Sequence, residues 1–191
     1  MDGNKLTNKF KNAILKAKEL AKKNNHQFLR PVHLLLTIIN DENIAFLRIL
    51  EITGCDSNKL KNSLSSYLMK MPEVTGFETD ILPSQELIRI LEDCETIREQ
   101  NRDSFIPTEI FLVAMSRNPN EASAILAENG INEKKLILAI NAVNGGKPMY
   151  SADDEEQRMA LRRFTVDLTE IAKKGTLDPI IGRDEEIRRT M

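Results

Sequence analysis

The residues of this chain that could do chemistry are few, and the first to consider are two histidines and two cysteines. His26 and His33 lack the further His, Cys or carboxylate ligands at workable spacing that a metal site would need. His33 falls within a short apolar helix, so we interpret it as a packed or hydrogen-bonded residue. Neither Cys55 nor Cys94 belongs to a nucleophile motif, and Cys94 falls on the apolar face of its helix, as a core residue does. We therefore predict no metal site and no catalytic residue among these four side chains.

The run Gly145-Gly146-Lys147-Pro148 is superficially similar to a phosphate-binding loop. That motif needs Ser or Thr after its lysine to reach Mg²⁺, and this chain has Pro148 there. It also needs a glycine five residues before the second one, where this chain has Asn141. We interpret the run as a linker and expect this chain to bind no cofactor and to hydrolyse no ATP by itself.

The composition excludes several other classes of function. The net charge is −2 over 191 residues, so no basic surface points to nucleic acid or to an anionic membrane. The longest apolar run, Leu34 to Ile39, is far short of the ~20 residues that span a bilayer. The N-terminus lacks the order of charges and apolar residues of a signal peptide. Two cysteines suit a reducing compartment, so we expect a cytoplasmic protein without disulfides.

The elements that must position any site are helices. Apolar residues recur at three- and four-residue spacing through the first ~145 residues, and no stretch shows sustained alternation, so an all-α fold without a sheet is predicted. Ser84, Asp56 and Asn132 are expected N-caps, and Gly54 and Gly130 follow helices, where a left-handed cap suits glycine. The predicted helices are Asn8–Lys23, Pro31–Asn40, Ile44–Ile52, Ser57–Met69, Gln85–Gln100, Thr108–Ser116, Ala122–Glu128 and Glu133–Val143.

The helical part contains an internal repeat. Placing Phe28 over Phe105, 77 positions later, also places the apolar positions of the flanking helices over one another, and after a slip of one residue Gly54 meets Gly130. Each unit is a long helix, a turn carrying Phe-[Leu/Ile], two shorter helices, a glycine and a closing helix. One such unit buries its apolar stripe poorly alone. We therefore predict two four-helix repeats that pack together with approximate two-fold symmetry.

The composition changes after Val143, which sets the domain organisation. Glycines and Pro148 should end the last helix, and the acidic stretch 151–157 is expected to be a short, solvated helix. A new apolar pattern begins near Phe164, and the chain stops inside what reads as another helix, so we expect a truncated module. The predicted parts are a helical domain over 1–145, with repeats over about 5–71 and 83–145, a linker over 146–163, and the truncated module over 164–191.

The doubled helical unit, followed by Asp178-Pro179-Ile180-Ile181-Gly182-Arg183, resembles the Clp ATPase family. Further strings are similar to its ClpB branch: Leu6-Thr7-Asn8-Lys9-Phe10, Arg30-Pro31-Val32-His33-Leu34, Pro83-Ser84-Gln85-Glu86-Leu87 and the run from Thr165 to Thr190. The resemblance covers essentially the whole chain, and the terminal run is its most specific part.

The resemblance implies a Clp N-terminal domain joined to the start of an α/β ATPase module of the AAA+ class. The parent protein would be a homohexamer that uses ATP and Mg²⁺ and extracts polypeptides from aggregates with the DnaK chaperone system. Its N-terminal domain would bind exposed apolar segments of unfolded clients, and this fragment would be a monomer. Residues that border the nucleotide base in such ATPases correspond to Pro179, Ile180 and Ile181.

The resemblance also implies client-binding residues. Its polar positions are Thr7, Asp103 and Glu109, and neighbouring apolar candidates are Leu91, Ile97 and Ile110. Each has a structural alternative. Thr7 is a good N-cap, Glu109 falls in a helix's first turn where a carboxylate complements the dipole, and helical apolar stripes normally face the core.

Three hypotheses for function follow. The first is a client-binding module for unfolded polypeptides. The second is a regulatory domain that docks a folded adaptor, as in the protease-linked Clp relatives. The third, an enzyme in its own right, has little support in the sequence, and ATPase activity of the purified chain would be needed to establish it.

Overall fold

The protein's structure, a computed structural model, divides into two compact units, Met1–Met159 and Ala160–Met191, which are described separately. In the second unit the described residues include one helix, α10 (Leu168–Lys173). No helix in the described part of the chain is long and apolar enough to cross a bilayer. Pro179, Ile180 and Ile181 lie outside the described residues, as does the run 145–147. The structure describes residues 3–41, 44–74, 80–144, 148–157 and 168–173, and residues 175, 185, 188 and 189.

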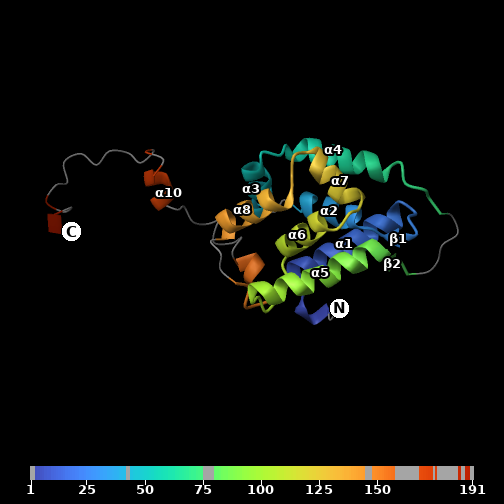
Figure 1. Cartoon of the computed structure of the whole chain (residues 1–191), viewed down its shortest axis with the longest axis horizontal. Helices are drawn as coiled ribbons and strands as arrows, with labels where there is room; N and C mark the ends of the chain where they lie inside the picture. The colour runs from blue at the N-terminus through green and yellow to red at the C-terminus, as the bar shows by residue number, and fades with distance from the viewer. Residues whose placement is uncertain are drawn as a thin grey trace. The chain divides into compact units, whose positions relative to one another are not determined.

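In the first unit, eight α-helices have both ends among the described residues, and each of these bounds lies within one residue of the predicted one (Figure 1). Residues 154–157 are also helical. A short 3-10 helix, η1 (Gly3–Lys5), precedes them. The apolar periodicity was sufficient for this prediction because every helix buries one face in the core. The helices are α1 (Asn8–Lys23), α2 (Pro31–Asn40), α3 (Ile44–Thr53), α4 (Ser57–Leu68), α5 (Gln85–Asn101), α6 (Thr108–Arg117), α7 (Glu121–Glu128) and α8 (Glu133–Asn144).

The predicted helix ends are confirmed by their hydrogen bonds. The hydroxyl of Ser84 accepts from the Leu87 amide at 3.3 Å, and the carboxylate of Asp56 accepts from two amides of the first turn of α4. Asn132 accepts from the Lys135 amide at 3.0 Å. Gly54 and Gly130 both adopt φ +78°, a left-handed conformation that costs a residue with a side chain energy.

The prediction that no sheet forms is wrong in one detail. β1 (Phe28–Leu29) pairs in parallel with β2 (Leu82–Pro83), and Leu6 forms an isolated parallel bridge with Ile106. Two-residue strands are too short to show an alternating pattern, so periodicity could not predict them.

These short pairings are related by the offset of 77 positions that the predicted repeat has. The amide of Thr7 donates to the carbonyl of Ile106 at 3.1 Å, and the amide of Ser84 donates to the carbonyl of Leu29 at 2.9 Å. The two donors, Thr7 and Ser84, are 77 positions apart, and so are the two acceptors, Leu29 and Ile106. In each half, the residue that caps the long helix therefore donates its backbone amide hydrogen to a carbonyl in the turn of the other half.

The core is shared between the two halves. The rings of Phe10 on α1 and Phe111 on α6 are both fully buried, with centroids 5.6 Å apart. Helix α3 packs against α8 and α4 packs against α7, so helices of one half cover those of the other (Figure 1). One continuous apolar cluster extends from Leu6 to Val143. The apolar faces of each half are therefore covered by the other half.

The stretch 151–157 was predicted to be solvated, and the structure corrects this. Glu155 is only 3% exposed and accepts hydrogen bonds from the side chains of Thr7 and Thr108. Met149, just upstream, is 2% exposed. Acidity indicated a surface segment, but the sequence could not show that two buried hydroxyls lie beside Glu155.

We predict that the two halves unfold together. Replacing Phe111 by alanine should cost about 3–5 kcal/mol, because it leaves a cavity at the centre of the shared core. The free energy of unfolding should be measured by urea denaturation, followed by circular dichroism. Leu138→Ala, at a position that is 69% exposed, is the control and should change it by less than about 0.5 kcal/mol. Two separate transitions would contradict a shared core.

Candidate functional site

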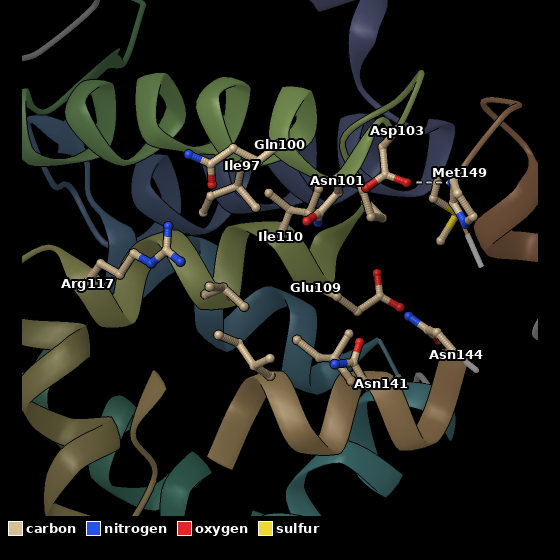
Figure 2. Close-up of a pocket in the computed structure, with 15 residues that line it drawn as sticks. Ile97, Gln100, Asn101, Asp103, Glu109, Ile110, Arg117, Asn141, Asn144 and Met149 are labelled. Carbon is tan, nitrogen blue, oxygen red and sulfur yellow. Dashed lines mark hydrogen bonds between the residues drawn. The ribbon is translucent and has the colours of Figure 1, made fainter. Parts of the chain in front are cut away.

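Four of the six predicted client-binding residues line one pocket. Ile97, Asp103, Glu109 and Ile110 surround a cavity of about 280 Å³ bounded by α5, α6 and α8 (Figure 2). These residues come from two successive helices and the loop between them, and the packing of α5 on α6 brings them together. The other lining residues are Gln100, Asn101, Pro107, Val113, Arg117, Ile137, Ile140, Asn141, Asn144, Pro148 and Met149.

Sequence reasoning missed the wall that α8 contributes. Ile137 and Ile140 are one helical turn apart and lie opposite the isoleucines of α5 and α6. Ile137 is 36% exposed, whereas Leu136 and Ala139 of the same helix are buried in the core. The signal was present in the sequence, because α8 has apolar residues on more of its surface than one core-facing stripe requires.

Thr7 and Leu91 do not line this pocket. Thr7 is fully buried, and its hydroxyl caps α1 by accepting from the Phe10 amide at 3.2 Å. The same hydroxyl donates to Glu155 Oε2 at 2.7 Å. Leu91 on α5 is partly buried and packs against the core. Thr7 is therefore a helix cap and Leu91 packs against the core, as their structural alternatives predicted.

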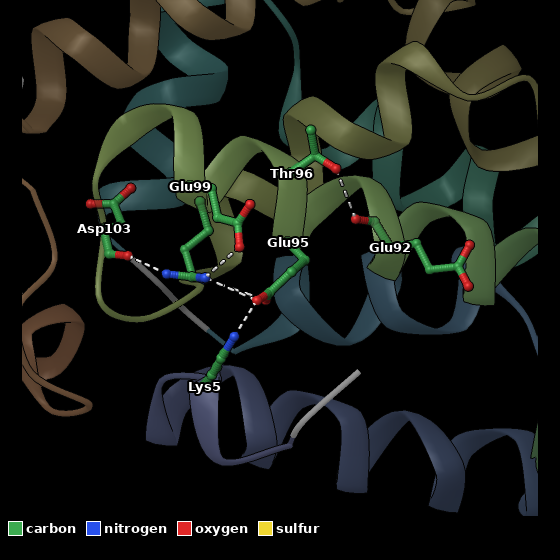
Figure 3. Close-up of polar contacts among 7 residues, drawn as sticks. Lys5, Glu92, Glu95, Thr96, Glu99 and Asp103 are labelled. Carbon is green, nitrogen blue, oxygen red and sulfur yellow. Dashed lines mark hydrogen bonds and ion pairs between the residues drawn. The ribbon is translucent and has the colours of Figure 1, made fainter.

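Asp103 lies in the loop between α5 and α6, which is held on both sides. Arg98 donates to the carbonyl of Asp103 at 2.8 Å and also pairs with Glu95, which in turn pairs with Lys5 at 2.5 Å (Figure 3). The carboxylate of Asp103 accepts from the backbone amide of Met149 at 2.6 Å (Figure 2). Asp103 is therefore a fixed, nearly buried carboxylate at one end of the pocket.

Glu109 belongs to a buried charged cluster with Glu155 and Lys9. Burial raises the pKa of Glu109 to about 7, and the negative charge of Glu155 adds to the rise. Burial also raises the pKa of Glu155, whereas the hydroxyls of Thr108 and Thr7 stabilise its charged form. Burial lowers the pKa of Lys9, and the neighbouring carboxylates oppose that change. One lysine balances one carboxylate, so we expect Glu109, which has fewer donors, to hold the shared proton.

One oxygen of the Glu109 carboxyl is unsatisfied in the described part of the chain. Among the described residues, Glu109 Oε2 is buried and has no hydrogen-bond partner, although the side chain lines the pocket. An unsatisfied buried carboxyl oxygen is costly, by about 1–3 kcal/mol. A group that enters the pocket with a hydrogen bond for this oxygen would recover that cost.

The histidines and cysteines lie in the core. His33 is fully buried, and its Nε2 lies 2.8 Å from His26 Nδ1, which confirms the interpretation of a hydrogen-bonded helix residue. Burial lowers the pKa of His33 to about 4. Cys94 is a core residue as predicted, and burial raises the pKa of its thiol. No group of three potential metal ligands occurs among the described residues.

The Glu109 carboxyl should make stability depend on pH. Its folded-state pKa is above its unfolded value near 4.5, so the folded state binds more protons between pH 4.5 and 7 and the free energy of unfolding falls as pH rises through that window. Glu109→Gln should remove this slope and raise stability at pH 8 by about 1–3 kcal/mol. Urea denaturation at pH 5 and pH 8 measures it. Glu128→Gln, at an exposed position, is the control; an unchanged slope in Glu109→Gln would contradict the assignment.

The chain matches the family model of the Clp repeat N-terminal domain over residues 5–141. It is 36% identical over 187 residues to the chaperone protein ClpB of Vibrio vulnificus, strain YJ016, which covers 98% of this chain. It is 37% identical over 193 residues to ClpB of Rickettsia bellii, which covers all of it. In both cases the chain spans 22% of the relative's length.

Solved structures show the same fold. The N-terminal domain of Hsp104 from Candida albicans superposes with a TM-score of 0.70 at 20% identity, over 78% of this chain and 98% of that one. A ClpV N-domain in complex with a VipB peptide superposes with a TM-score of 0.59 at 17% identity, over 75% and 89%. The family match, the ClpB relatives and the fold agree with the resemblance read from the sequence. The chain therefore belongs to the Clp repeat N-terminal domain family, and it is similar to ClpB chaperones over its whole length.

Proposed function

We propose that this domain engages exposed apolar segments of unfolded or aggregated proteins in the pocket between α5, α6 and α8. The observation that carries the proposal is the combination of isoleucines on both walls with Glu109, whose Oε2 is buried without a partner among the described residues. Sites for flexible apolar ligands combine apolar walls with a few fixed polar groups. We call this pocket the client groove.

A client segment would use both features of the client groove. Its apolar side chains would lie against Ile97, Ile110 and Ile137, and removal of apolar surface from water would drive binding. A backbone amide of the client would donate to Glu109 Oε2. Ordering a flexible chain in one shallow groove costs entropy, so we expect weak binding, which suits a domain that must release its clients.

The parent protein we infer is a ClpB-type disaggregase. Its ATPase module would begin within 164–191, with Pro179, Ile180 and Ile181 beside the nucleotide base, and would use ATP and Mg²⁺. The ring would be a homohexamer that works with the DnaK system in the cytoplasm. The identity to ClpB proteins over the whole chain supports this inference.

We also infer that the two helical halves are copies of one unit. The offset of 77 positions supports this, because it relates the hydrogen bonds of Thr7 and Ser84. It also relates Asn25 (φ 53°) to Arg102 (φ 60°), which share a left-handed conformation that is uncommon outside glycine.

A second candidate is docking of a specific partner or adaptor. The observation that favours it is the ClpV N-domain, which shares this fold and has been solved with a VipB peptide. The two candidates differ in the partner. A client-binding domain binds many unfolded sequences through apolar side chains, whereas a docking domain recognises one.

We predict that Ile137→Ser weakens client binding about 5- to 10-fold, because a half-exposed isoleucine in the groove contributes on the order of 1 kcal/mol of apolar burial. The matched control is Leu138→Ser, the next residue of α8, which is 69% exposed and does not line the groove. Both variants remove a similar apolar side chain from the same helix.

The measurement is the affinity for a fluorescently labelled, permanently unfolded protein, followed by anisotropy. Amide shifts in NMR spectra should cluster at Ile97, Asp103 and Ile110. Equal weakening by both variants would show that binding is not specific to the groove. Binding of one folded partner and of no unfolded protein would favour adaptor docking instead.

A further inference from the structure

Residues 148–157 run from the client groove at one end to the buried side chain of Glu155 near the other; we call them the strap. The strap follows α8 and belongs to the same compact unit as the helices. Its first residues, Pro148 and Met149, line the client groove. Its last turn carries Glu155, which does not line the groove. The two ends are held by different contacts.

The first anchor consists of two hydrogen bonds made by the backbone of Met149 beside the groove. The amide of Met149 donates to Asp103 Oδ1 at 2.6 Å, and the carbonyl of Met149 accepts from the Ser104 amide at 2.7 Å (Figure 2). The Met149 side chain is 2% exposed. The carboxylate of Asp103 is thus used to hold the strap.

The second anchor is the carboxylate of Glu155, which is buried at the start of two helices. It accepts from Thr7 Oγ1 at 2.7 Å, from the Thr108 amide at 3.3 Å and from Thr108 Oγ1. Thr7 begins α1 in the first half and Thr108 begins α6 in the second. Charge-assisted hydrogen bonds of this kind are the strong ones, so Glu155 is the principal lock of the strap.

Between the anchors the strap is tied to the start of α1. The amide of Asn8 donates to the carbonyl of Ala152 at 3.0 Å, and the Asn8 side chain donates to Asp153 at 2.6 Å. Asp154 accepts from the amides of Tyr150 and Ser151 within the strap. The strap therefore has its own internal structure and docks as a unit.

The docked strap forms an end wall of the client groove and leaves the groove open. A cavity of about 280 Å³ remains beside Pro148 and Met149, with isoleucines on its other walls. A client in the groove would contact this wall and bury more apolar surface than it could without it. Any ligand that contacts the docked strap stabilises the docked state. Docking raises the affinity for that ligand by the same free energy.

We propose that the strap completes the client groove and that Glu155 locks it, so that client binding and strap docking strengthen each other. This rests on the proposed function of the groove. Release of the strap would free ten residues, which span roughly 35 Å when extended.

The test uses the whole chain with Glu155→Ala, and Glu156→Ala as the matched control, since Glu156 is the next residue and is exposed. Amide hydrogen exchange at Met149 reports docking, and anisotropy with the labelled unfolded protein reports client affinity. In Glu155→Ala, exchange at Met149 should rise about 10-fold or more and client binding should weaken about 5-fold or more. Saturating client should slow exchange at Met149 in the unaltered chain. Glu156→Ala should do neither.

Three results would overturn the proposal. Unchanged exchange in Glu155→Ala would mean that Glu155 does not lock the strap. Faster exchange with unchanged affinity would mean that the groove does not need the strap. Faster exchange at Met149 on adding client would mean that client and strap compete.

Failure of the proposed function is recognised separately. If the unaltered chain binds no client, the function of the groove and the coupling fall together. Equal binding by both chains overturns the coupling alone. Should circular dichroism show that Glu155→Ala is unfolded, Glu155→Gln keeps the shape, removes the charge and is measured in the same way.

Discussion

The structure depends on one constraint: neither four-helix half can bury its own apolar surface. The contact of Phe10 with Phe111 and the packing of α3 on α8 cover faces that each half leaves open. This shared core fixes the two turns next to the starts of the two long helices. It therefore also brings Thr7 close to Thr108, although they come from different halves.

That closeness creates the polar interior of the domain. Glu155, Glu109 and Lys9 lie where the halves meet, and buried charges are costly unless they are paired and hydrogen-bonded. Glu155 has three hydrogen bonds and a lysine nearby, so its charge is compensated. Glu109 has fewer donors, and burial raises its pKa to about 7. The domain maintains this cluster at the edge of the groove rather than replacing it with apolar side chains, which suits a functional role.

The three polar residues suggested by the family resemblance are given different surroundings by the fold. Thr7 caps α1 and binds Glu155 in the domain interior. Asp103 holds Met149 and so fixes the end wall of the groove. Of the three, only Glu109 has a buried side-chain oxygen without a hydrogen-bond partner in the described part of the chain, and its side chain lines the groove. A change at any of the three could alter client binding, but we expect each to act by a different route.

The sequence by itself determined the helices and their caps, because these follow from periodicity and from side chains close to one another along the chain. The family resemblance read from it also named six candidates for one site, of which the last four line one pocket: Thr7, Leu91, Ile97, Asp103, Glu109 and Ile110. It did not identify the α8 wall with Ile137 or the burial of Glu155. Those depend on which faces meet when two halves 77 residues apart pack together, and a solvated acidic stretch and a docked one have the same composition. Only the tertiary structure, by supplying the hydroxyls of Thr7 and Thr108, decided that Glu155 lies inside.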